Sequence, residues 1–109
     1  YSNDGGNFTD VIVDLLGFQD SAVAWGASAP DGDLDIAIAG QDGGTGVIAI
    51  YRNDGGSFTD INAGLDALLQ GSVAWGDYNN DGKLDLLVSG EGAGNTPLIM
   101  VYRNNAGNF

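Results

Sequence analysis

The sequence contains neither cysteine nor histidine. Without cysteine the chain forms no disulfide and has no thiolate nucleophile or thiolate zinc ligand. Without histidine it lacks the commonest general base and the commonest ligand of transition metals, so a serine or threonine nucleophile would have no usual partner. Paired carboxylates would still suffice for a glycoside hydrolase, but turns and one oxygen-rich loop account for most of the aspartates. We therefore expect a protein that is not an enzyme.

Basic residues are also scarce. The chain has 3 Lys and Arg against 15 Asp and Glu, which gives a formal net charge of −12. This balance argues against nucleic acid or an anionic membrane surface as a partner, because both require cationic patches. No apolar run approaches the roughly 20 residues of a membrane-spanning helix. Proline occurs only twice, whereas 19 glycines stand at intervals along the chain, a pattern typical of many short strands joined by tight turns.

An internal repeat organises the chain. When residues 1–40 are aligned without gaps to residues 51–90, 18 of the 40 positions are identical, and Trp25 corresponds to Trp75. The terminal segment 102–109 repeats the pattern of residues 1–8 once more. A repeat of about fifty residues that holds about four short strands is typical of a propeller blade.

Residue patterns divide each repeat into short strands and turns. We predict an all-β fold built of two four-stranded β-propeller blades. Residues 1–20 would provide an outer strand for a neighbouring blade, residues 21–62 blade 1, residues 63–70 a connector, and residues 71–109 blade 2 without its outer strand. The predicted strands are 8–13, 21–26, 34–39, 47–53, 58–62, 72–76, 84–89 and 98–104.

The most informative stretch is the loop at residues 77–85. Oxygen-bearing side chains alternate at Asp77, Asn79 and Asp81, and Asp85 follows after Gly82. Glycine permits the positive φ that such a turn needs, and alternating oxygen ligands suit a hard cation such as Ca²⁺. A metal-free turn rich in Asp and Asn is the alternative, although three carboxylates so close together would repel one another without a cation. An EF-hand is excluded, because the twelfth position holds Val88 instead of glutamate and strands flank the loop.

The loop and the strands that flank it resemble a known family. The string V-A-W-G-D-Y-N-N-D-G-K-L-D-L-L-V-S-G, followed by Y-R-N-N, resembles the FG-GAP/VCBS repeat of integrin α-subunit propellers and some fungal lectins. The resemblance implies that each repeat is a propeller blade and that the loop between its first two strands binds calcium. It implies side-chain ligands at Asp77, Asn79, Asp81 and Asp85 and a backbone carbonyl ligand at Lys83.

The equivalent loop of the first repeat, residues 27–35, departs from this pattern. Two of the four side-chain ligand positions are alanine, whereas Asp31 and Asp35 remain and Asp33 replaces Lys83. Calcium takes six to eight oxygen ligands, so we expect a site that is weak or empty. Trp25 and Trp75 stand in the first strand of each repeat, and we expect them in the core between blades rather than as platforms for a ligand.

Two blades cannot close a propeller, which usually needs about four to eight. We therefore expect a cyclic homo-oligomer, a trimer with six blades or a tetramer with eight, unless the chain is a piece of a longer propeller. The expected role is a calcium-stabilised structural or protein-interaction module, as in adhesion proteins. The alternative is a lectin that binds glycans between blades. The family resemblance indicates an extracellular or cell-surface location.

Overall fold

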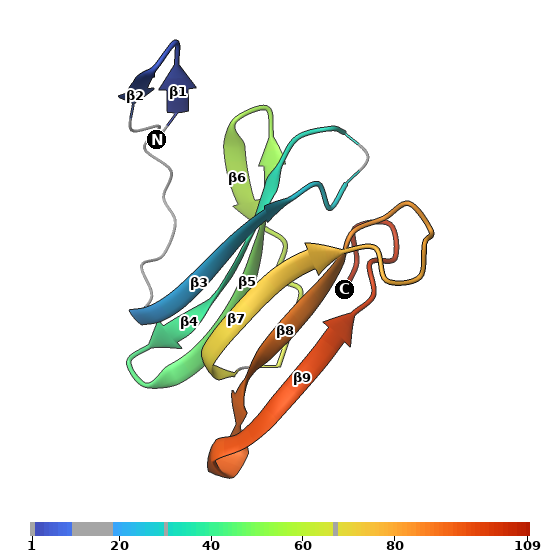
Figure 1. The fold of residues 1–109 in the computed structure, drawn as a ribbon. Coiled ribbons are helices and arrows are strands. Elements are labelled where there is room, and N and C mark those ends of the chain that lie inside the picture. The colour runs from blue at the N-terminus through green and yellow to red at the C-terminus, as the bar shows by residue number, and fades with distance from the viewer. Residues whose placement is uncertain (1, 10–18, 30, 67) are drawn as a thin grey trace.

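The computed structural model describes residues 2–9, 19–29, 31–66 and 68–109 (Figure 1), and within them the fold is all-β. This confirms the predicted fold class. A single 3-10 turn, η1 (Ala93–Asn95), interrupts the strands and was not predicted. The strands in chain order are β1 (Ser2–Asp4), β2 (Asn7–Thr9), β3 (Gln19–Gly26), β4 (Asp35–Asp42), β5 (Thr45–Asp54), β6 (Ser57–Asp60), β7 (Leu69–Gly76), β8 (Asp85–Gly92) and β9 (Thr96–Tyr102).

The strands form two antiparallel sheets and one small hairpin. The first sheet has the order β3-β4-β5-β6, the second has the order β7-β8-β9, and β1 and β2 pair only with each other. The sheets begin at residues 19 and 69, two residues before the predicted starts of the two blades. The predicted strand 8–13 is described only as far as Thr9, and its remainder lies outside the described residues.

The two sheets lie face to face (Figure 1), and a face of small side chains packs against a face of large ones. The first sheet contributes mainly small side chains to this interface, including the fully buried Ala37 and Ala39. The second sheet contributes Val73, Leu86 and Val88. Alternate residues of a strand point to opposite faces, so this split between small and large follows directly from the sequence. The complementarity allows the two sheets to approach closely.

Trp75 fits into this interface at Gly26. A Cβ added at Gly26 would lie 2.3 Å from the Trp75 Cγ, so only glycine leaves room for the indole ring. The Trp75 indole N–H donates to the Ala24 carbonyl oxygen at 3.2 Å. The prediction that Trp75 belongs to the core between blades is confirmed.

Trp25 lies on the opposite face of the first sheet and is 60% exposed. The prediction that it is a core residue is therefore wrong for the single chain, because the face that carries Trp25 is turned away from the second sheet. Its ring contacts Phe58 at a centroid distance of 6.2 Å, much as Trp75 contacts Phe109 at 5.7 Å. The two tryptophans thus occupy equivalent places on their own sheets and differ in what covers them.

This difference makes a matched pair of variants. We expect Trp75→Ala to lower the free energy of unfolding by about 3 kcal/mol, because it empties a packed site between the sheets. We expect Trp25→Ala to cost less than about 1 kcal/mol in the single chain, because the ring is exposed. Urea denaturation of both variants, under conditions where the chain is monomeric, measures the difference. Equal losses would contradict the assignment of Trp75 to the interface.

Candidate metal centre

The candidate metal centre lies in the loop between β7 and β8. Gly76 and Asp85 form the last pair of the hairpin, so residues 77–84 must reverse the chain between two paired strand ends. Gly82 has φ +83° and Asn80 has φ +59°, both in the left-handed region. The positive φ predicted for Gly82 is confirmed, and asparagine is one of the few other residues that tolerate this conformation.

Backbone N–H groups of the loop hold its carboxylates in place. Asp77 accepts hydrogen bonds from the backbone N–H groups of Asp81, at 3.0 Å, and Gly82, at 2.8 Å. Asp81 accepts one from the Lys83 N–H at 2.9 Å. This bond from Lys83 is the main reason that the pKa of Asp81 lies below its usual value, so Asp81 stays ionised at neutral pH.

Asp85 is 1% exposed and connects the loop to the end of β9. Its carboxylate accepts hydrogen bonds from the backbone N–H of Tyr78 at 3.2 Å and from that of Asn104 at 2.7 Å. A buried carboxylate needs such donors, because burial without them is costly. Asp85 therefore fixes one wall of the candidate site from within the protein.

Three carboxylates converge in this loop. One oxygen from each of Asp77, Asp81 and Asp85 lies within 4.8 Å of the others. Negative charges at this separation repel one another, and a divalent cation among them would turn the repulsion into attraction. Carboxylate oxygens are the ligands that Ca²⁺ prefers, so this donor set fits a calcium ion.

The other two predicted ligands lie beside these carboxylates. The Asn79 side-chain amide donates to Asp81 at 3.2 Å, so its nitrogen faces the carboxylate, and the amide would have to turn over to offer its oxygen to a cation. Lys83 donates its backbone N–H to Asp81, and its carbonyl as a ligand stays a prediction.

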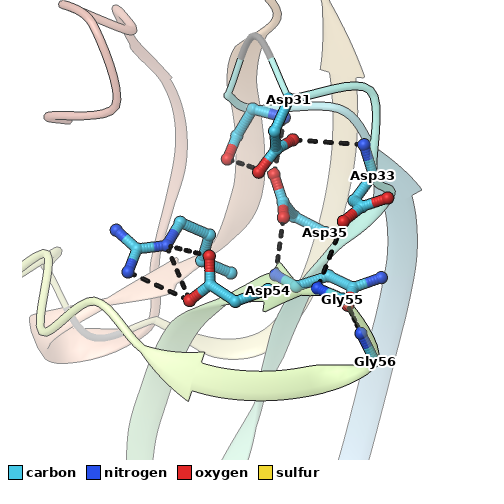
Figure 2. A network of polar contacts seen from close by, with 9 residues as sticks. Asp31, Asp33, Asp35, Asp54, Gly55 and Gly56 are labelled. Carbon is cyan, nitrogen blue, oxygen red and sulfur yellow. Dashed lines mark hydrogen bonds and ion pairs between the residues drawn. The ribbon is translucent and has the colours of Figure 1, made fainter.

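The first loop, shown in Figure 2, has the same anchor but a different interior. Asp35 is fully buried and accepts backbone N–H bonds from Ser28 and Asn53, both at 2.7 Å, which are the counterparts of those that Asp85 accepts from Tyr78 and Asn104. The Ser28 hydroxyl supplies Asp35 with a third donor.

The remaining carboxylates of the first loop are also engaged within the protein. Asp31 accepts the Asp33 N–H at 3.1 Å, and Asp33 accepts the Gly55 N–H at 3.2 Å (Figure 2). Within the described residues, three metal-capable carboxylates converge in the second loop and not at Asp31, Asp33 and Asp35. Hydrogen bonds within the protein thus engage all three carboxylates of the first loop, and the weak or empty site there stays a prediction.

Asn104 was not among the site residues predicted from the sequence. This residue is fully buried, and its amide nitrogen donates to the carbonyl oxygens of Ser28, at 2.7 Å, and Leu84, at 2.9 Å. Its amide oxygen accepts the Gly107 N–H at 2.7 Å. Asn104 therefore links the loop between β3 and β4 to the loop between β7 and β8 by hydrogen bonds. The recurrence of Tyr-Arg-Asn at 51–53 and 102–104 was the signal that could have identified it.

The fold and the loop together define a class: an all-β repeat protein whose sheets each carry an aspartate-rich loop between their first two strands. The family described as FG-GAP-like repeat matches residues 30–88, and that described as FG-GAP repeat matches residues 70–108. The chain belongs to the FG-GAP repeat family, as its sequence suggested. No curated protein and no solved structure matches the chain. Within the described residues, no helix has the length and apolar character that would let it cross a membrane.

Replacing Asn104 tests the link between the loops. We expect Asn104→Ala to lower the free energy of unfolding by about 3 kcal/mol, because two buried carbonyl groups and one N–H lose their partner. The control is Asn105→Ala at the exposed neighbouring position, for which we expect a change within about 0.5 kcal/mol. Chemical denaturation measures both values. An Asn104→Ala variant as stable as the control would show that the link contributes little.

Proposed function

We propose that the chain is a calcium-binding β-propeller repeat module with a structural and protein-interaction role, and not an enzyme. The observation that carries the proposal is the convergence of the Asp77, Asp81 and Asp85 carboxylates in the loop between β7 and β8. The side chains of these residues and of Asn79, with the Lys83 carbonyl, would supply the protein ligands. Water would complete the six to eight oxygens that calcium takes.

The cation would act mainly on stability. The loop is held at Asp85, but Asn79 and Asp81 are exposed, Asp77 is half-buried, and the carboxylates of Asp77 and Asp81 repel each other. A bound Ca²⁺ would neutralise this cluster and pin the exposed part of the loop to the buried carboxylate of Asp85. Extracellular calcium modules bind with Kd values of about 10⁻⁴–10⁻³ M, and we expect an affinity in this range or somewhat tighter.

The module would act as part of a closed ring. A pair of sheets leaves two outer faces without a partner, and repeat proteins gain their stability from neighbouring repeats. Association into a trimer with six blades or a tetramer with eight would provide those neighbours. FG-GAP repeats are typical of extracellular and surface proteins, and we propose such a location for this chain.

A lectin is the second candidate, because a cavity lies between the loop at residues 27–34 and the loop at residues 77–84. Its volume is about 200 Å³, and its lining includes Ser28 of the first loop and Lys83 of the second. This is below the roughly 300–1,000 Å³ of typical small-molecule pockets, so the cavity would hold only a small ligand. Binding on a glycan array would support the lectin, and the absence of binding would leave the structural role.

Calcium titration tests the proposed site. At 10 mM Ca²⁺, a Kd of about 10⁻⁴–10⁻³ M would raise the free energy of unfolding by about 1.4–2.7 kcal/mol. We expect the wild type to show this gain over chelator in denaturation experiments, and Asp81→Asn to lose most of it. Magnesium at the same concentration should give a smaller gain, because Mg²⁺ retains its water more strongly.

The matched control for this titration is Asp31→Asn, the equivalent change in the first loop. It should leave the calcium-dependent gain intact, because Asp31 is not part of the convergent group. A wild type that gains no stability from calcium would refute the proposal. An equal loss of the gain in both variants would place the binding elsewhere.

A further inference from the structure

Two outer faces of the protein carry exposed apolar side chains. On the first sheet, Val23 is 64% exposed and Trp25 is 60% exposed. On the far side of the second sheet, Leu87 is 44% exposed, Val101 50% and Ile99 76%. Side chains of this kind gathered on two sheet faces mark surfaces for association.

These two outer faces repeat the two faces that already pack together inside the chain. Val23 and Trp25 stand where Val73 and Trp75 stand in the second sheet, which are the residues that face the first sheet. Correspondingly, the outer face of the second sheet carries Ala74 where the first sheet has Ala24, although the larger Leu87 replaces Ala37. The Val23 and Trp25 face therefore corresponds to the side that projects into the interface between the two sheets. The face with Ala74 corresponds to the side that receives it, and we call this face the socket.

The socket on the second sheet is open. Within the described residues, a Cβ added at Gly76 would meet nothing within 4 Å, whereas one at the equivalent Gly26 would meet the Trp75 ring. A cavity of about 250 Å³ lies at this position, and Ala74, Leu87 and Val101 are part of its lining. The cavity lies beside Gly76 on the second sheet, as the Trp75 indole lies beside the equivalent Gly26 on the first.

The polar groups of the two outer faces match as well. Inside the chain, the Trp75 indole donates to the Ala24 carbonyl, and the Asn104 amide donates to the Ser28 carbonyl. Asn53 is the equivalent of Asn104, and its oxygen accepts the Gly56 N–H as that of Asn104 accepts the Gly107 N–H.

The Asn53 side-chain nitrogen, in contrast, has no hydrogen-bond acceptor among residues 2–9, 19–29, 31–66 and 68–109. By the same correspondence, its acceptor in a second copy would be the Tyr78 carbonyl, and that of the Trp25 indole would be the Ala74 carbonyl.

We propose that copies of this chain associate head to tail, with the Val23 and Trp25 face of one copy packed into the Gly76 socket of the next. The proposal rests on the proposed repeat module and specifies the surface that would close its ring. The interface is heterologous, because the two faces differ, so an open chain of copies keeps one unpaired face at each end until a ring closes. The burial of apolar side chains at this contact must outweigh the mutual repulsion of chains that each carry a charge of −12.

Native mass by light scattering tests the proposal, measured over a range of protein concentrations with calcium present. We expect the wild type to form one species of three or four copies, with a blue shift of tryptophan emission as Trp25 becomes buried. We expect Gly76→Val to remain a monomer with no such shift, because the new side chain fills the socket. A wild type that stays monomeric at every concentration would overturn the proposal.

Folding of the Gly76→Val variant is the necessary control. A Cβ added at Gly76 meets no described atom within 4 Å beyond its chain neighbours, and Gly76 does not have a positive φ, so the thermal unfolding of the variant should match that of monomeric wild type. Gly26→Val should unfold far more easily, since it collides with Trp75. Thr59→Val replaces a hydroxyl with a methyl group on the exposed side of strand β6 and should leave the mass of the oligomer unchanged. Loss of the oligomer in Thr59→Val would contradict the assigned surface.

The calcium titration keeps the two proposals separate. Wild type that binds calcium but remains a monomer would overturn the head-to-tail interface and leave the metal site. Wild type that associates without any gain from calcium would support the interface and refute the metal site. A ladder of masses that Gly76→Val abolishes would support the interface and contradict a closed ring.

Discussion

The structure depends on one carboxylate in each sheet, buried where the loop after the first strand meets the end of the third. Asp35 and Asp85 each accept a backbone N–H from their own loop and another from the residue just after Tyr-Arg, Asn53 or Asn104. Charge-assisted bonds of this kind are stronger than neutral ones, and they fix the loop to a strand outside the hairpin. Because both partners are backbone groups, the arrangement tolerates very different residues elsewhere in the loop.

That tolerance explains how one loop gathers three carboxylates into a candidate metal centre while the other uses different residues. With the anchor in place, the second loop gathers Asp77 and Asp81 beside Asp85. In the first loop, the Ser28 hydroxyl supplies Asp35 with a donor, and Asp33 turns to the Gly55 N–H. In both loops backbone N–H groups hold the carboxylates, but among the described residues three carboxylates converge as a donor set suited to a cation in the second loop and not in the first.

Much of this could be predicted from the sequence, because it follows from local patterns. The strands follow from alternation and turn residues, and the convergent loop follows from oxygen side chains at every second position before Gly82. The exposure of Trp25 could not be predicted in this way, because Trp25 and Trp75 have the same local sequence. Trp75 is covered because its face meets the first sheet, whereas the face that carries Trp25 meets no other sheet among the described residues. The role of Asn104 was also hidden, since its partners lie 20 and 76 residues away along the chain.

The same residue connects the metal loop to the packing of the sheets. Asn104 donates its backbone N–H to Asp85 in the candidate metal centre and its side-chain amide to Ser28 in the loop of the neighbouring sheet. A cation bound at Asp85 would therefore also hold the residue that spans the two sheets, and its binding and the packing of the sheets would stabilise each other. Any such effect must be reciprocal, because the free energy that couples two sites is the same from either side. Through Asn104, a bound cation would strengthen the packing of the two sheets within the chain, and that packing would raise the affinity of the loop for the cation.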